Sequence, residues 1–222
     1  PDQVSSVPAP LGDTTACALV PFAPSMSLRP TTTQAESPSG MDVSLSIDQT
    51  GMLEPTGTAP AHLKRAVVTL PEGMTLNPSA ADGLEGCTTA QIGLISKNPI
   101  RFDSSDARCP NGAKVGTAKI TTPVLEDPID GSLYLADQAD NPFDTLLSGY
   151  LVAEGQGVLI KLAGRFDADR RTGRITATFD NNPQQPFSEL ELHFKAGNRG
   201  VLITPPACGT YEIESKLSPW SA

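Results

Sequence analysis

The chain has 222 residues, a length that suits one large β domain or two small ones. Its net charge is −9, and its 16 basic residues are scattered along the sequence. Because nucleic acids and anionic membrane surfaces attract clustered Lys and Arg, this balance argues against both as partners. The 21 prolines favour short strands and turns over long helices.

The two ends of the chain differ in character from its middle. Residues 1–15 are poor in apolar residues and rich in Pro, Ser and Ala, which predicts a flexible linker followed by a single module over residues 16–222. The chain starts at Pro1 without a leader-like segment, so we expect a mature or excised fragment. The longest apolar stretch, residues 146–162, is interrupted by polar side chains, and no membrane-spanning segment is expected.

Apolar and polar residues alternate in many short segments, the pattern of strands with one buried face. In residues 42–49, Val43, Leu45 and Ile47 alternate with polar residues. Residues 164–180 have the pattern of a hairpin with a polar turn at 167–173. Further strands are predicted at 65–70, 115–121, 131–136, 146–154, 158–166, 190–194, 201–204 and 211–217. Because antiparallel sheets with one wet face alternate in this way, we expect an all-β antiparallel sandwich.

Helical signals are confined to the region around Cys87. Residues 79–84 predict a short helical turn, and Thr88 followed three residues later by Gln91 fits a capping box. Residues 96–111 are polar and are predicted to form a loop.

Four cysteines occur without a C-x-x-C pair, which favours disulfides over a zinc site. Four cysteines allow three pairings. We expect a local bridge, Cys87–Cys109, and a clamp between the chain ends, Cys17–Cys208. The alternative is four buried thiols in a cytosolic protein, where disulfides do not persist.

Acidic loops are the candidate metal sites, because calcium prefers clustered oxygen ligands. The best candidate ligands are Asp137, Asp140 and Asp144, and residues 180–182 form a second acidic loop. Asp and Asn also dominate turns for purely local reasons, and no EF-hand pattern is present. Calcium is therefore the one cofactor considered, and no other is expected.

Glu189 and Glu191 are the candidate pair for glycoside hydrolysis, since two residues on one strand face have roughly the required carboxylate separation. The competing interpretation is a solvated outer face of mixed charge, continued by His193 and Lys195. We favour that interpretation, and no catalytic residue is assigned.

Exposed aromatic side chains would be needed to stack on sugars. Trp220 is the sole Trp, and the three tyrosines, Tyr134, Tyr150 and Tyr211, fall on predicted strands and could equally lie in the core. The sequence therefore contains no aromatic cluster that identifies a sugar site.

Several short strings occur in a characteristic order. They are Leu70–Pro78, Cys87–Gly93, Cys109-Pro110, Val115–Thr117, Gly131–Ala136, Asn141–Phe143, Thr178–Pro183 and Thr204–Gly209. In this order they resemble an uncharacterised tandem-repeat domain of large secreted actinobacterial proteins, over roughly residues 17–220. The resemblance implies an extracellular β module repeated along a long chain, with no assigned activity and no catalytic residues to transfer.

These observations lead to a functional hypothesis. We expect an extracellular or cell-surface module with a structural or adhesive role and no enzymatic activity. Its expected partners are neighbouring repeats of the parent chain and cell-wall or extracellular polysaccharide. The alternatives are a carbohydrate- or calcium-dependent binding module and a glycoside hydrolase.

Overall fold

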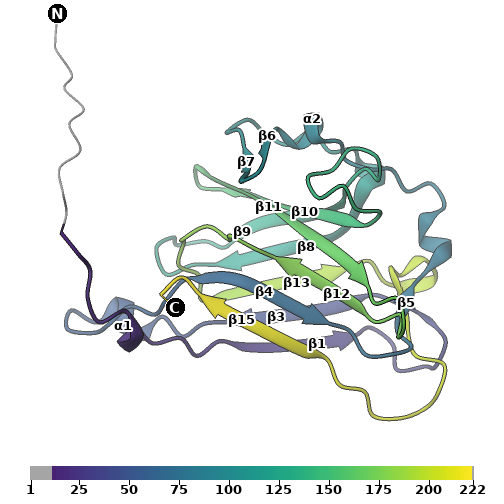
Figure 1. The fold of residues 1–222 in the computed structure, drawn as a ribbon, viewed down its shortest axis with the longest axis horizontal. Coiled ribbons are helices and arrows are strands. Elements are labelled where there is room, and N and C mark those ends of the chain that lie inside the picture. The colour runs from purple at the N-terminus through teal and green to yellow at the C-terminus, as the bar shows by residue number, and fades with distance from the viewer. Residues whose placement is uncertain (1–11, 222) are drawn as a thin grey trace, which may run out of the picture.

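The computed structural model describes residues 12–221, and its framework is one antiparallel sheet of ten strands. The strand order is β1-β3-β13-β8-β9-β10-β11-β12-β4-β15. Their bounds are β1 (Ser25–Pro30), β3 (Met41–Ser46), β13 (Glu189–Phe194), β8 (Lys114–Thr121), β9 (Ile129–Leu135), β10 (Ser148–Gly155), β11 (Val158–Ala168), β12 (Ile175–Phe179), β4 (Leu63–Thr69) and β15 (Glu214–Pro219). The sheet curls until β1 and β15 lie side by side, so it forms two layers of a nearly closed barrel (Figure 1). The predicted all-β antiparallel class is confirmed.

The alternation in the sequence determines which face of each strand is buried. In β3, Val43 and Leu45 are buried inside the barrel, while Asp42 points to solvent. The two end strands are not bonded to each other through their backbones, but Met26 of β1 and Leu217 of β15 pack in one cluster around Leu45. Side-chain burial therefore closes the barrel where the hydrogen-bonded ladder ends.

A pair of glycines makes room for an aromatic pair in the interior. Gly149 of β10 lies directly opposite Gly164 of β11. The rings of Phe166 and Phe179 meet edge to face next to them, with centroids 6.3 Å apart. A Cβ atom on Gly164 would lie 2.5 Å from the Phe179 ring, so no larger residue fits there without displacing that ring.

Small elements complete the two ends of the barrel. A three-stranded sheet contains β2 (Pro38–Ser39), β14 (Leu202–Ile203) and β5 (Thr75–Leu76), and short helical turns form at η1 (Cys17–Leu19), α1 (Thr50–Leu53) and η4 (Gly197–Arg199). Residues 12–15 have no regular structure, and residues 1–11 of the predicted linker lie outside the described residues. No helix within residues 12–221 has the length and apolar character needed to cross a membrane.

Residues 77–113, the insertion, connect β5 to β8 and fold separately from the barrel wall. They contain η2 (Pro78–Ala81), α2 (Thr89–Ile92), β6 (Leu94–Lys97), β7 (Ile100–Phe102) and η3 (Asn111–Ala113). The predicted capping box is present, with the Thr88 hydroxyl accepting from the Gln91 amide and the Gln91 side chain accepting from the Thr88 amide. The prediction of a loop over residues 96–111 is wrong in part, because β6 and β7 pair as a hairpin there.

The insertion packs on the outer face of the barrel, above β10 and β11 (Figure 1). Its Ile92 is fully buried, and its Phe102 meets Tyr150 of β10 edge to face with ring centroids 6.3 Å apart. The predicted bridge Cys87–Cys109 is confirmed and closes this segment on itself. By the loop-entropy model, a bridge over a loop of this size stabilises the fold by about 3 kcal/mol.

The predicted clamp Cys17–Cys208 is wrong, because both thiols are exposed and unbridged. Phe22, shortly after Cys17, packs in the same cluster as Leu217 near the end of β15, whereas Cys208 precedes the start of β15. A six-residue strand spans roughly 20 Å, and a disulfide needs Cα atoms within about 7 Å. In Figure 1 the two segments lie at opposite ends of the barrel.

Candidate functional site

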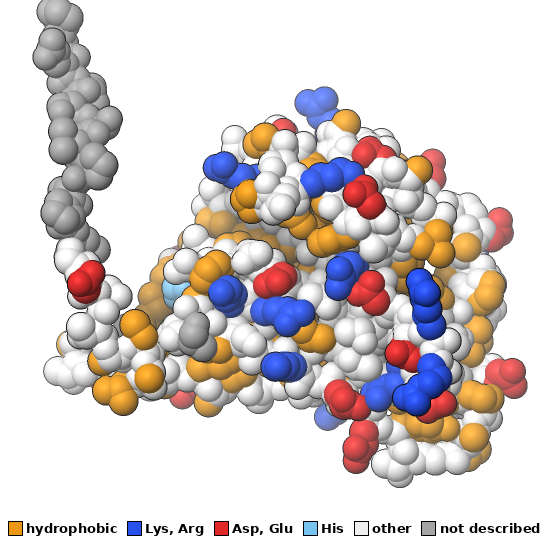
Figure 2. Space-filling view, in the orientation of Figure 1, with side chains coloured by type: hydrophobic (Ala, Val, Ile, Leu, Met, Phe, Trp, Pro, Cys, Tyr) orange, Lys and Arg blue, Asp and Glu red, His pale blue; other side chains and the backbone are white. Residues whose placement is uncertain are grey.

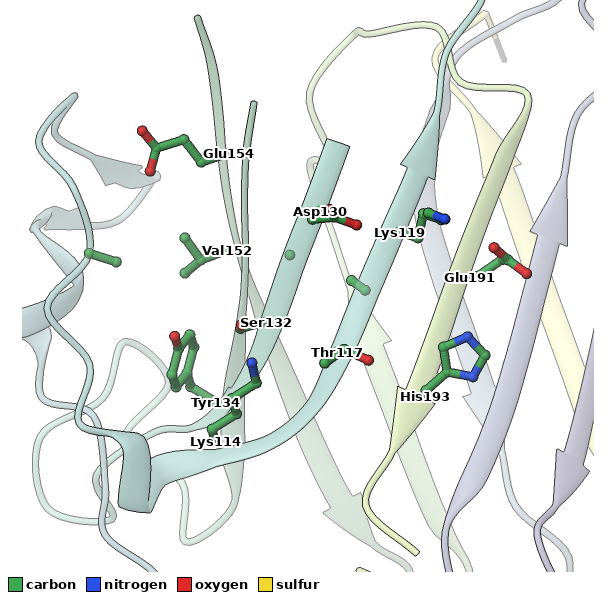
Figure 3. Close-up of a pocket in the computed structure, with 13 residues that line it drawn as sticks. Lys114, Thr117, Lys119, Asp130, Ser132, Tyr134, Val152, Glu154, Glu191 and His193 are labelled. Atoms are coloured by element: carbon green, nitrogen blue, oxygen red, sulfur yellow. The ribbon is translucent and has the colours of Figure 1, made fainter. Parts of the chain in front are cut away.

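An open groove of about 640 Å³ lies on the outer face of the sheet, over β13, β8, β9 and β10 (Figure 3). Its lining is polar for the most part, with four apolar or aromatic contributions from Ala107, Ala118, Val152 and Tyr134. The remaining lining residues are Lys114, Thr117, Lys119, Asp130, Gly131, Ser132, Glu154, Glu191 and His193.

The pairing register brings the lining residues together in rows that cross the strands. One row contains Glu191, Lys119, Asp130 and Glu154, each the cross-strand partner of the next. Since neighbouring strands are about 4.8 Å apart, this row spans roughly 15 Å. Its side chains come from four separate strands, so only the folded sheet assembles it.

A second row lies parallel to the first, two residues away from it on each strand. It contains His193, Thr117, Ser132 and Val152, again as successive cross-strand partners. Outside the groove, Nδ1 of His193 lies 3.0 Å from Oδ1 of Asp42 on β3. The hydroxyls of Thr117 and Ser132 therefore lie between a charged row and the Tyr134 end of the groove (Figure 3).

The insertion forms the wall of the groove through Ala107, and a buried lysine of β11 holds that wall in place. The Lys161 ammonium group donates to Oδ1 of Asp103 at 3.0 Å and to the Ser105 carbonyl at 2.6 Å. The Lys161 side chain is only 3% exposed, whereas that of Asp103 is 42% exposed. Hydrogen bonds from the Ser105 hydroxyl and from Lys161 lower the pKa of the Asp103 carboxyl. This ion pair ties the chain before Ala107 to the sheet.

The charged groups of the groove form no close ion pairs among the described residues, although Lys119 lies between two acidic cross-strand partners, Glu191 and Asp130. Within residues 12–221, none of the five side chains Lys114, Lys119, Asp130, Glu154 and Glu191 makes an ion pair within 4.0 Å. The groove therefore presents separate charges of both signs. The face of the molecule seen in Figure 2, with β12, β4 and β15 in front, also carries interspersed basic and acidic side chains, so no patch of one sign dominates that face.

The predicted calcium ligands do not converge, and this prediction is wrong. Asp137 accepts hydrogen bonds from the amides of its own turn, Asp140 accepts from the amide and hydroxyl of Thr89, and Asp144 pairs with Lys97 at 2.7 Å. Across residues 12–221, no three His, Cys, Asp or Glu side chains are arranged to hold a metal ion. Each of these aspartates has a local structural role instead.

The two glutamates proposed as a catalytic pair, Glu189 and Glu191, lie in different surroundings. Both residues lie on the outer face of β13, but only Glu191 lines the groove, while Glu189 accepts a hydrogen bond from the Ser44 hydroxyl at 3.2 Å. His193 belongs to the groove lining, and Lys195 follows the end of β13. Glu189 and Glu191 therefore do not face each other across a binding cleft.

The aromatic candidates have four different environments. Tyr150 is only 2% exposed, and burial raises the pKa of its hydroxyl. Tyr211 donates to the Ala207 carbonyl at 2.6 Å, and Trp220 donates to the Asn182 carbonyl while Lys64 lies 4.9 Å from its ring centroid. Tyr134 alone lines the groove.

Sequence reasoning missed most of the groove, including Lys119, Asp130 and Glu154. All three are the polar members of alternating strands, so the local signal marks them as outward-facing but not as neighbours. Their proximity depends on the register of three strand pairs, which is a non-local property.

No protein-family model matches the chain, and no curated protein or solved structure matches it.

Proposed function

We propose that this chain is an extracellular structural or adhesive module of a larger secreted or cell-surface protein, and that it holds a partner in the outer groove. The observation that carries the proposal is the groove itself, whose wall is tied to the sheet by Lys161 and whose charged side chains make no ion pair within 4.0 Å among residues 12–221. Charged groups that make no ion pair in the folded chain are available to recognise a ligand.

The disulfide supports the extracellular location. Bridges such as Cys87–Cys109 persist in oxidising compartments and are rare in reducing ones. The family resemblance supports an arrangement in which neighbouring repeats of the parent chain are further partners.

The environment of the acidic groups supports a binding role without catalysis. Asp130 and Glu154 are direct cross-strand partners, but their carboxyl groups point away from each other, whereas a retaining glycosidase needs two carboxyl groups that face the same bond (Figure 3). A glycosidase also needs one carboxyl group in an apolar setting so that this group keeps its proton, and both of these side chains are exposed. Binding without bond cleavage is the function that this setting favours.

Polysaccharide binding is a second candidate, favoured by Tyr134. This half-buried ring lines the same groove as the hydroxyls of Ser132 and Thr117, and an aromatic surface together with hydrogen-bonding groups suits a sugar chain.

The proposal is tested with the immobilised full chain and two matched variants. Thr117→Trp places a bulky side chain in the groove, and Ser27→Trp places the same side chain on the exposed outer face of β1. Binding to soluble cell-wall polysaccharides and to a library of extended peptides is measured by biolayer interferometry. Loss of binding in Thr117→Trp alone supports the proposal. Equal binding by both variants would rule out the groove, and no binding by the unmodified chain would rule out the adhesive role.

A further inference from the structure

The two cysteines outside the disulfide are exposed at opposite ends of the barrel. Cys17 is the first residue of η1, shortly before β1, and Cys208 lies in the loop that leads into β15. The length of β15 separates the two segments, so these thiols cannot bridge each other within one molecule (Figure 1). A thiol at each end of one molecule can instead meet the other thiol of a second copy.

The chemistry that would join these thiols is thiol–disulfide exchange. Bridges such as Cys87–Cys109 persist in oxidising surroundings, where exposed thiols are also converted to disulfides. The oxidant is a small-molecule or protein disulfide. One cysteine thiolate attacks it and forms a mixed disulfide, and the second cysteine thiolate then displaces the remaining half of the oxidant as a thiol. Two cysteine thiols thereby become one S–S bond, and the oxidant is reduced to two thiols.

Exposed apolar side chains accompany the thiol at the η1 end. Leu19, two residues after Cys17, is 80% exposed, and Leu53 at the end of α1 is 67% exposed. Phe22 follows η1, Ile47 precedes α1, and these two residues pack in one cluster, so η1 and α1 lie at the same end of the barrel. Hydrophobic side chains are visible on the surface at this end (Figure 2). Apolar side chains exposed together are candidates for burial by a partner.

The end that carries Cys208 also exposes large side chains. Tyr211 is 41% exposed, and its hydroxyl donates to the Ala207 carbonyl, which folds residues 207–211 back on themselves. Leu76 of β5 is 46% exposed, and β5 pairs with β14, the strand that leads into this loop. The two ends of the barrel therefore each present a thiol with exposed apolar groups, but on different local structures.

We infer that this chain binds a second copy of itself end to end, with Cys17 of one copy bonded to Cys208 of the next. The apolar side chains at the two ends bring the thiols together, and the disulfide makes the contact permanent. Because the two surfaces differ, the contact is heterologous, and its repetition extends the assembly into a linear array of modules. The inference does not depend on the outer groove or on a ligand bound there.

The test starts from dilute monomer in which both thiols are free. The full chain is incubated at increasing concentration in a buffer of reduced and oxidised glutathione, and the products are separated by non-reducing electrophoresis. We expect a ladder of linked copies that grows with protein concentration and collapses to monomer on reduction. Mass spectrometry of unreduced peptides from the dimer band should identify the linkage between Cys17 and Cys208.

Matched variants assign the two ends. Cys17→Ser and Cys208→Ser should each remain monomeric alone, whereas their equal mixture should give a dimer and nothing longer. Leu19→Ser should slow linking about three- to tenfold, because it removes apolar surface from the contact. Ile95→Ser removes a side chain that is 68% exposed on the insertion and should leave the rate unchanged. Thermal melts of all four variants confirm folding.

Three results would overturn the inference. If either cysteine variant forms dimers by itself, like ends pair and the end-to-end arrangement is wrong. If the unmodified chain gives only monomer, with glutathione adducts or an internal bridge, the copies make no contact through these ends. If Leu19→Ser links as fast as Ile95→Ser, the thiols meet by random collision and no docking surface exists at the η1 end.

Discussion

The glycine pair inside the barrel leads to a specific stability prediction. Replacing Gly164 with Ala places a Cβ atom 2.5 Å from two atoms of the Phe179 ring, closer than real Cβ contacts allow. The ring cannot retreat freely, because it meets Phe166 edge to face, and the Phe166 ring in turn covers Gly149. Overpacking of this kind costs about 1–3 kcal/mol, so we expect Gly164→Ala to lower the free energy of unfolding by that amount.

The matched control is Gly155→Ala, also in the barrel wall. Its Cβ would meet Ile129 at 3.5 Å, an ordinary contact, and Gly155 is not among the glycines with positive φ. We expect this variant to be neutral or slightly more stable, since Ala lowers the entropy of the unfolded chain. The free energy of unfolding is measured by urea titration, with the m-value used to check that the denatured state is unchanged.

The double variant Gly164→Ala/Phe179→Leu separates steric conflict from other causes. A smaller side chain at position 179 makes room for the new methyl group, so the cost of Gly164→Ala should fall by about 1 kcal/mol or more in that background. If Gly164→Ala is as stable as Gly155→Ala, or if the two changes in the double variant are additive, the steric argument is refuted.

Three further predictions concern the cysteines and one turn. In the native protein, Cys17 and Cys208 should both react with iodoacetamide before any reduction, giving a mass increase of two adducts, and an unlabelled native protein would contradict the structure. Replacing Cys87 and Cys109 with Ser should lower the free energy of unfolding by about 3 kcal/mol in urea titrations, and an unchanged midpoint would contradict this. Hydrogen bonds from the amides and hydroxyl of its own turn lower the pKa of Asp169, so its stabilising effect is complete above the unfolded value of 3.8 and is lost as pH falls through the folded pKa. Melting curves of Asp169→Asn and the unmodified protein should therefore converge as pH falls from 5 to 2, as described by proton linkage, and a constant difference would contradict the assignment.

The features that sequence patterns predicted correctly are local. The capping box at Thr88 and Gln91 requires only four consecutive residues, and the alternation in β3 requires only one strand. The bridge between Cys87 and Cys109 closes a short loop, so chain proximity made it the favoured pairing. In each case the interacting groups are close in sequence, and their geometry follows from the backbone period.

The wrong predictions treated sequence position as spatial position. The clamp between Cys17 and Cys208 assumed that the chain ends meet, whereas β15 leads the chain from one end of the barrel to the other between Cys208 and the C-terminus. The calcium prediction took a run of aspartates as a cluster, but Asp137 and Asp140 are used to fix the backbone of their own and a neighbouring turn. Short acidic side chains in loops commonly have that role.

The groove shows why a candidate binding surface on a sheet cannot be recognised in the sequence, although the residues that fix its register can. Its floor depends on the register that aligns Glu191, Lys119, Asp130 and Glu154, and a slip of one residue in any strand would turn that strand's contribution into the core. The buried apolar residues that alternate with them fix that register. The wall is tied to the sheet by the buried Lys161, and the Cys87–Cys109 disulfide closes the segment that forms it. If the groove binds the partner proposed for it, this pre-organisation lowers the entropy lost on binding.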